Sequence, residues 1–225
     1  MRERALRLSA EALVIFFSVV LALLADDWRT ARDDHAAERE YLASIVRDLE
    51  LDSRALSQLD DRLGKQVAAN AALLKFVEQG AGEDSVRSVI DDALQVFNYR
   101  PNYPTYQSLV GSGDLKLVDS PDLRDQITLY HEGWSAYLNT LLNGVSNRAD
   151  EVSQLLRPYV RRREVAPGVW QIVHVDSLDD LAKQAAVLNA VADCAGLRSL
   201  LRSRVQELFL AENAKLREAI EAYLS

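Results

Sequence analysis

The most apolar stretch of the chain lies near its N-terminus. Residues 12–25 are fourteen positions of which only Ser18 is polar. As a helix this run is about 21 Å long, against roughly 30 Å of hydrocarbon in a bilayer. A helix over residues 6–25 has twenty residues and a length of about 30 Å, which is enough to cross. The pattern therefore predicts an N-terminal transmembrane helix.

Two other interpretations of this stretch stay open. A cleaved signal peptide needs a basic start, which residues 1–7 provide, and small residues before the cut. Cleavage after Ala25 would place the large Leu23 at position −3, and cleavage after Ala22 would leave two leucines exposed. A core helix fits the length, but apolar residues on every face are more typical of a helix in lipid. We therefore favour an uncleaved anchor.

The flanks of the predicted span suggest its interfaces and its orientation. Asp26, Asp27 and Trp28 follow the apolar run, and tryptophan is enriched at membrane interfaces. Arginines flank both sides almost equally, but a long polar domain is translocated largely regardless of its charge. We expect the protein to lie in the bacterial inner membrane, with its N-terminus in the cytoplasm and its soluble domain in the periplasm.

Glu11 falls inside the predicted span, about 8 Å from one edge by helix rise. An ionisable group at the centre of a bilayer costs at least about 2.5 kcal/mol, and less near an edge. Glu11 can mark the membrane boundary, paired with Arg7 one turn away. It can also contact a partner helix, or take part in proton or ion movement.

A long amphipathic helix is expected to continue from the span. Residues 28–79 contain no proline and only one glycine, Gly64. Apolar residues recur at alternating spacings of three and four, with Asp52 as the one polar interruption. The stripe comprises Leu42, Ile45, Leu49, Leu56, Leu59 and Leu63. Its spacing is typical of a coiled coil and makes Leu42, Leu49 and Leu56 candidate contacts with a partner.

Further helices are expected beyond the glycines at 80 and 82. A second helix should begin at a cap on Asp84 or Ser85 and run through Phe97. Ser120 and Pro121 start a long helix that Pro158 closes, and Ser177 caps the last one. Around Pro167 and Gly168 a small hairpin or extended loop is favoured. The predicted fold class is all-α, an antiparallel helical bundle with that insert, divided into an anchor (1–28) and a helical soluble domain (29–225).

An aromatic, proline-containing stretch at residues 98–106 interrupts the helices. It brings Tyr99, Tyr103 and Tyr106 close together in sequence, and Trp134 lies on the next long helix. Aromatic side chains with polar tips suit interfaces and ligand pockets. They also commonly fill the end of a helical bundle, so both uses stay open.

Charge and composition argue against nucleic-acid binding and against sites built from several cysteines. The net charge of −8, from 26 basic and 34 acidic residues, argues against nucleic-acid binding. The one dense basic run, Arg161–Arg163, is more often a solvated turn than a phosphate site. Cys194 is the only cysteine, which excludes an intrachain disulfide and a cysteine-rich zinc site. We expect it to be a buried or half-buried thiol.

No motif indicates catalysis, a metal or a cofactor. His131-Glu132 lacks a second histidine four residues on, where Ser135 stands. Ser112 lies between two glycines but outside the frame of a nucleophile elbow. No glycine-rich phosphate loop follows a strand. The sequence therefore predicts a protein that is not an enzyme.

Scattered positions resemble a bacterial family of single-span membrane proteins, domain of unknown function 6090. The similar positions are Ala10-Glu11, Ala22-Leu23, Asp26-Asp27-Trp28, Glu40-Tyr41-Leu42, Asp48-Leu49, Thr105-Tyr106, Leu109, Ser112-Gly113 and Leu123-Arg124. The family usually has glycine at position 10 and asparagines at 26 and 27. The resemblance implies a membrane anchor and makes Glu11 a family feature, but it implies no activity.

Taken together, the sequence predicts a membrane-anchored, non-catalytic interaction or scaffold module of the bacterial envelope. Its expected partners are membrane lipid and a second copy or another envelope protein. Two alternatives are a subunit of an ion-driven membrane complex that uses Glu11, and a ligand-sensing helical domain with the aromatic stretch as its pocket.

Overall fold

The computed structural model describes residues 2–95, 99, 101, 103–175, 180–181 and 183–225, with side chains from residue 16 onward except those of 169 and 170. The described chain is mostly helical, which confirms the predicted all-α bundle with a small insert. The helices are α1 (Arg2–Glu78), α2 (Glu83–Leu94), α3 (Pro104–Ser112), α4 (Pro121–Thr128), α5 (Ser135–Leu156), α7 (Ala185–Arg204) and α8 (Leu210–Leu224), and the strands are β1 (Val160–Ala166) and β2 (Val169–Val175).

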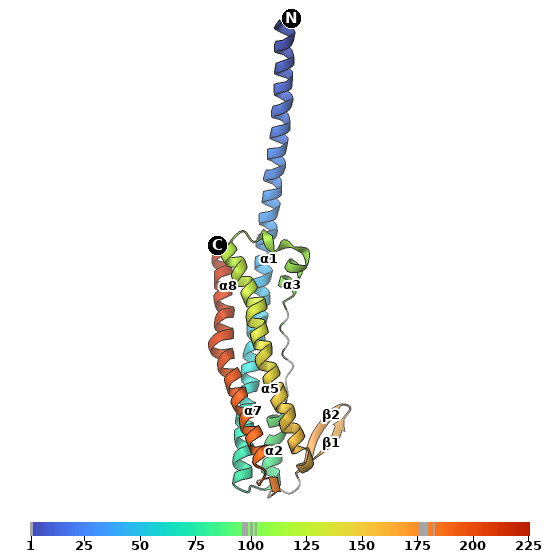
Figure 1. Ribbon diagram of the computed structural model, residues 1–225, viewed down its shortest axis with the longest axis vertical. Coiled ribbons are helices and arrows are strands. Elements are labelled where there is room, and N and C mark those ends of the chain that lie inside the picture. The colour runs from blue at the N-terminus through green and yellow to red at the C-terminus, as the bar shows by residue number, and fades with distance from the viewer. Residues whose placement is uncertain (1, 96–98, 100, 102, 176–179, 182) are drawn as a thin grey trace.

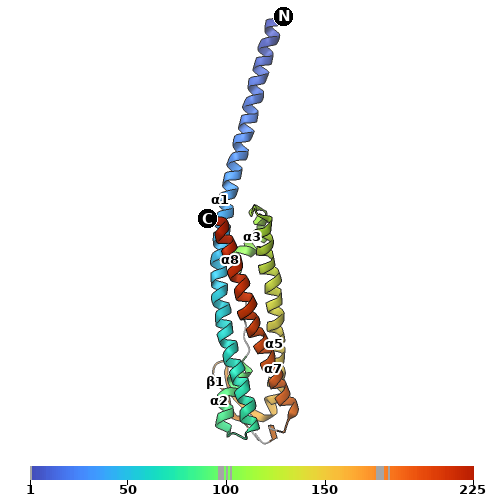
Figure 2. The same cartoon turned by 90° about the vertical axis from the view of Figure 1, so that its left-hand side faces the viewer.

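Three helical rods form the bundle (Figures 1 and 2). The first is α1, the second joins α4 to α5 through a π-helical turn (Leu129–Trp134), and the third joins α7 to α8 through another (Val205–Phe209). The rods α1 and α4–α5 run in the same direction, and only α7–α8 runs against them. The predicted antiparallel packing therefore holds for α7–α8 against each of the other two rods, whereas α1 and α4–α5 are parallel to each other.

The reason lies between α2 and α3, which are at opposite ends of the bundle (Figure 1). The chain returns along the bundle there, and the described residues of this connection, Tyr99, Pro101 and Tyr103, are not helical. Pro101 and Pro104 disfavour a regular helix through this stretch. This return lies where a fourth rod would otherwise stand, so α1 and α5 run parallel to each other.

The N-terminal part of α1 projects from the bundle as a single rod, while the C-terminus lies where this rod leaves the bundle (Figure 1). From residue 16 onward, where side chains are described, Glu38 is the first buried residue of the helix. Between residues 16 and 24, six large apolar side chains are 54% to 65% exposed. A search of the described residues finds no helix that is both long and apolar enough to cross a membrane.

The helix boundaries agree in part with the start and stop signals of the sequence. Ser120 caps α4 by accepting a hydrogen bond from the Leu123 backbone N–H at 3.3 Å. Gly80, with φ of 60°, follows the end of α1 as predicted. The cap predicted at Asp84 or Ser85 is wrong, because α2 begins at Glu83 with no side-chain cap. It ends at Leu94, before the predicted end at Phe97. Phe97 and the predicted cap Ser177 lie outside the described residues.

The core consists of apolar side chains from all three rods. Leu42 and Leu49 pack with the aromatic residues near α3, and Leu56 packs in the middle of the bundle against residues of α5 and α7. All three leucines are almost completely buried. The interpretation of this stripe as a contact between chains is therefore corrected: its face of α1 is covered by the chain's own helices. Cys194 is buried, as expected.

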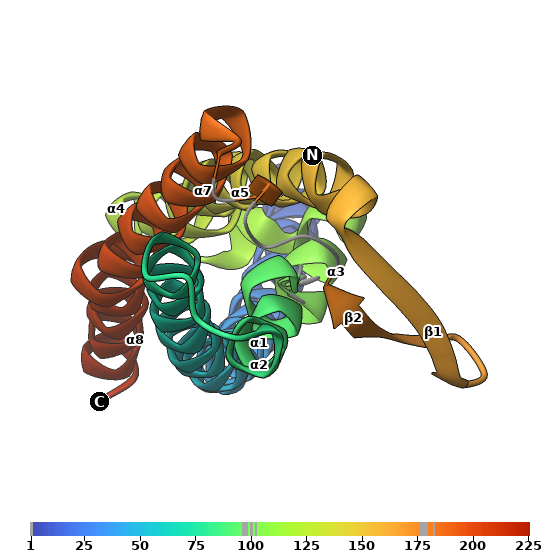
Figure 3. The same cartoon turned by 90° about the horizontal axis from the view of Figure 1, so that it is seen from below.

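The strands β1 and β2 form an antiparallel hairpin around Gly168, which has a φ of 75°. The hairpin predicted around Pro167-Gly168 is confirmed, and it extends away from the bundle (Figure 3). Glu83, in the first turn of α2, ties its base to the bundle. Its Oε1 accepts hydrogen bonds from the Val175 backbone N–H at 3.1 Å and pairs with His174 Nδ1 at 2.6 Å.

We expect the docking of this hairpin to weaken in acid. The Val175 hydrogen bond and then the His174 contact hold the pKa of Glu83 below its ordinary value of 4.5. A lowered pKa in the folded state stabilises the contact above pH 4.5, and the contribution is lost as the pH falls toward the folded pKa. Amide-exchange protection factors of β1 and β2 should fall in that window.

The substitution Glu83→Gln should remove this acid dependence. Asp84→Asn is the matched control, because Asp84 is the neighbouring acid and reaches the hairpin only through Arg87, which donates to the Val173 carbonyl at 3.4 Å. An acid dependence that survives in Glu83→Gln, or disappears in Asp84→Asn, would contradict this assignment.

Candidate functional site

Asp52 is a carboxylate in the middle of the bundle, only 5% exposed. The Tyr99 hydroxyl donates to its Oδ1 at 2.5 Å. The Tyr130 hydroxyl donates to Oδ2, and Tyr103 lies 3.5 Å from the same oxygen. Asn213 Nδ2 is also 3.5 Å from Oδ2 and donates to Tyr130 Oη at 2.8 Å. Four segments that are distant in sequence therefore meet at one carboxylate, which we call the Asp52 cluster.

The π-helical turn between α4 and α5 positions one side of this cluster. A π turn inserts an extra residue into a helix, so neighbouring residues can face the same side. Here Tyr130 and His131 are both buried, although they are adjacent in sequence. The Tyr130 hydroxyl reaches Asp52, while His131 lies among the aromatic rings.

His131 is enclosed by tyrosines. Its ring stacks on Tyr106 at 4.4 Å between centroids and meets Tyr103 edge-on at 4.6 Å. Its Nδ1 lies 2.8 Å from the Ile127 carbonyl, which can only accept, so we assign the proton to Nδ1. Burial lowers the pKa of His131, which favours this neutral form. A neutral imidazole packed in this way fills the core.

The tyrosines act as hydrogen-bond donors. Burial, followed by the charge of Asp52, raises the pKa of Tyr99, Tyr103 and Tyr130 far above the ordinary value of 10.0. Burial and the hydrogen bond to Glu132 at 2.7 Å raise the pKa of Tyr106 to about 12. The hydroxyls therefore stay protonated at physiological pH.

The space beside the Asp52 cluster is too small for a substrate. A void of about 10 Å³ is lined by residues that include Asp52, Tyr103 and Ser135. Such a void holds about one water molecule. The Asp52 cluster therefore joins the three rods through buried hydrogen bonds.

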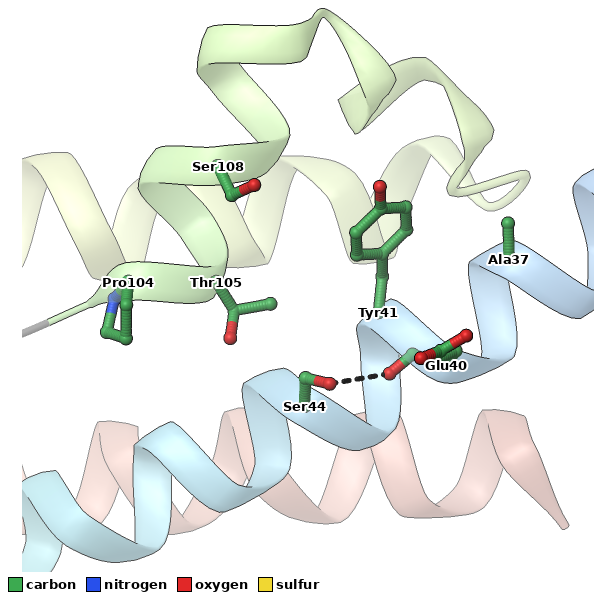
Figure 4. A pocket seen from close by; sticks show the side chains of 7 residues that line it. All are labelled: Ala37, Glu40, Tyr41, Ser44, Pro104, Thr105 and Ser108. Carbon is green, nitrogen blue, oxygen red and sulfur yellow. Dashed lines mark hydrogen bonds between the residues drawn. The ribbon is translucent and has the colours of Figure 1, made fainter.

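An open groove lies between α1 and α3, near the point where α1 leaves the bundle (Figure 4). Its volume is about 430 Å³, and its walls offer several hydroxyls and one carboxylate. The lining residues are Ala37, Glu40, Tyr41, Ser44, Pro104, Thr105 and Ser108. This groove has the size of a small-molecule site and the chemistry to hydrogen-bond a polar ligand.

Neighbouring acids fix the two walls of this groove. The Tyr41 hydroxyl donates to Asp114 Oδ2 at 3.2 Å, which raises the pKa of Tyr41. The Thr105 backbone N–H donates to Asp48 Oδ2 at 3.0 Å, which attaches the start of α3 to α1. Within the described residues, no group of three or more His, Cys, Asp or Glu side chains is placed to hold a metal ion.

The sequence-predicted site residues fall into two separate places. Tyr99, Tyr103, Tyr106 and Trp134 gather around the bundle core, where Trp134 and Tyr99 are half-buried and the other two are buried. This favours their use as core over use as a contact surface. Asp26, Asp27 and Trp28 are exposed on the projecting part of α1. Glu11 belongs to the same helix, but it precedes residue 16, where the described side chains begin.

Sequence reasoning missed Asp52 and Arg198 as central residues. Asp52 did carry a signal, since it is the one polar residue inside an apolar stripe. Arg198 is completely buried, although it is an arginine in a helix whose apolar pattern predicts no special role for it. A buried arginine is recognised only when its partners are known.

Comparisons with protein-family models, with curated proteins and with solved structures find no match to this chain. The resemblance to domain of unknown function 6090 stays a prediction.

Proposed function

We propose that this protein is a membrane-anchored, non-catalytic interaction or scaffold module of the bacterial envelope. The projecting part of α1 lies in lipid in this proposal, and the bundle is displayed on the periplasmic side. The observation that carries it is the set of exposed apolar side chains on a helix that stands apart from the bundle.

These side chains are Phe16, Phe17, Val19, Leu21, Leu23 and Leu24. Burying one such side chain contributes about 1.5–3 kcal/mol, so the six together favour an apolar environment by roughly 10 kcal/mol. At 100° per residue they cover an arc of about 200° of the helix circumference, a wide apolar face that suits a helix in lipid. Residues 6–15 supply the remainder of the proposed span.

The end of the apolar run supports an interface at this point. Trp28 is exposed, and the Arg32 guanidinium lies 5.8 Å from the centre of its ring. A tryptophan beside a cation suits the headgroup region of a membrane. Asp26 and Asp27 precede it and are exposed on the same helix. The resemblance to domain of unknown function 6090 agrees with this arrangement.

The interaction part of the proposal concerns the remaining surface. The leucine stripe is occupied within the chain, so contacts with another molecule must use other faces. The groove between α1 and α3 favours a second candidate function, sensing of a polar ligand beside the membrane. Use of Glu11 by an ion-driven complex remains an alternative based on sequence alone.

Membrane fractionation of the full chain, followed by carbonate extraction and flotation with vesicles, tests the anchor. The wild type should stay in the membrane fraction. The double variant Phe17→Asp with Leu21→Asp should be lost from it, because two acids inside a span cost about 5 kcal/mol. Leu51→Asp is the matched control, since Leu51 is a 60% exposed leucine of the same helix within the bundle.

Wild-type protein in the aqueous fraction would overturn the anchor, as would equal loss of the Leu51→Asp control. The interaction part has a separate test in the mass of the detergent-solubilised protein. A strict monomer without a co-purifying partner would count against a scaffold.

A further inference from the structure

A second cavity lies at the end of the bundle away from the projecting helix, where α5 passes into β1 (Figure 1). Its volume is about 420 Å³. Ser153 of α5, Arg157 of the following turn, and Val160 and Arg162 of β1 line it. Of the lining residues that the structure describes, two are arginines and none is an acid, and the space is of small-molecule size.

Hydrogen bonding within this cavity leaves donors for a ligand. Arg162 Nη2 donates to Ser153 Oγ at 3.1 Å. The serine oxygen accepts this bond, so its own O–H is left to donate elsewhere. A guanidinium carries five N–H donors, of which this contact uses one. Because Arg162 and Arg157 both line this cavity, the remaining donors of Arg162 border the same space as the guanidinium of Arg157.

The charge surroundings favour an anion. The chain carries a net charge of −8, yet Arg157 and Arg161–Arg163 concentrate positive charge at this corner. The pKa of Asp91 in α2 is raised by burial. A backbone hydrogen bond from Ile172 and the nearby charge of Arg162 partly offset this increase. Among the described residues no ion pair joins Asp91 and Arg162, and the side-chain hydrogen bond of Arg162 to Ser153 uses only one of its donors.

We propose that this cavity binds a small organic oxyanion, either a carboxylate or a phosphate ester. Arg157 and Arg162 hold the anionic group, because planar guanidiniums match carboxylate and phosphate oxygens in pairs. Ser153 donates a further hydrogen bond, and buried Val160 forms an apolar wall for the body of the ligand. This binding does not depend on the membrane anchor.

Calorimetric titration of the full chain in nonionic detergent, in a buffer free of phosphate and carboxylate, tests the proposal. Pyrophosphate is the phosphate probe and citrate is the carboxylate probe. At least one of them should bind saturably to one site, and the stronger probe identifies the source of the oxyanion. Arg157→Gln and Arg162→Gln should each weaken binding about tenfold, as expected on removal of one charge-assisted contact.

Arg163→Gln is the matched control. Arg163 follows Arg162 on β1 without an irregularity between them, so their side chains point to opposite faces of the hairpin. It removes the same charge from the same strand and should leave binding unchanged. Arg162→Lys keeps the charge but loses the paired donors, so it should also weaken binding. Thermal melting checks that each variant is folded.

Absence of saturable binding by both probes would overturn the site. Equal weakening by Arg162→Gln and Arg163→Gln would also overturn it, because that result indicates general attraction to a basic surface.

Discussion

Replacement of Asp52 by alanine is expected to destabilise the bundle by about 2–4 kcal/mol. The substitution removes the acceptor for the Tyr130 hydroxyl and for Tyr99, and it takes away a neighbour of Asn213. Buried donors without an acceptor each cost about 1–3 kcal/mol. Since a domain is commonly stable by only 5–15 kcal/mol, the loss should be large.

Chemical denaturation of the full chain in mild detergent measures this effect. Asp52→Asn should fall between the wild type and Asp52→Ala, because an amide keeps one acceptor oxygen but also presents donors to the tyrosines. Asp61→Ala is the matched control, as Asp61 is an exposed acid of the same helix. Its effect should stay within about 0.5 kcal/mol. Equal midpoints for Asp52→Ala and Asp61→Ala would show that the Asp52 cluster does not hold the rods together.

Replacement of Arg198 by methionine is expected to cost about 3 kcal/mol and to loosen the end of α2. Arg198 Nη1 donates to the Ala93 carbonyl at 2.5 Å and to Asn70 Oδ1 at 3.2 Å. Its Nη2 donates to the Gln95 carbonyl at 2.8 Å. The last carbonyls of a helix lack partners within it and carry its negative partial charge. Arg198 supplies both the donors and the opposite charge.

Methionine keeps the long apolar stem and removes the donors, so the effect should come from lost hydrogen bonds rather than from an empty space. Burial lowers the pKa of Arg198, but an arginine side chain remains charged at neutral pH. Its removal should therefore accelerate amide exchange in α2 before the rest of the bundle.

Arg202→Met is the matched control for this prediction. Arg202 lies one turn further along the same helix and forms a partly exposed ion pair with Asp60 at 3.0 Å. Such pairs contribute about 0–1 kcal/mol. If Arg202→Met lowers stability as much as Arg198→Met, the buried contacts of Arg198 have no special weight.

Local signals in the sequence were sufficient for many elements of the fold. Ser120 and Pro121 fix the start of α4 through a side-chain oxygen and a preset φ angle, and both effects act within one turn. Gly168 permits the positive φ of the hairpin turn. The apolar stripe of α1 correctly identified its buried face.

Features that depend on distant partners could not be predicted in this way. A periodic pattern gives the face of a helix but not its direction, so the parallel arrangement of α1 and α5 was missed. A π turn has no simple local signature, and the inward position of both Tyr130 and His131 depends on one. Asp52 was visible as a polar interruption, but its tyrosine partners come from other segments of the chain.

The continuity of α1 has a mechanical consequence. The chain has no proline before Pro101, and Gly64 is the one glycine of α1, so the projecting rod and its junction with the bundle lack the usual sites of a helix kink. They belong to one continuous helix from Arg2 to Glu78, which changes direction where it enters the bundle (Figure 2). A rotation of the projecting part therefore acts on the wall of the bundle through one unbroken helix, without an intervening hinge loop.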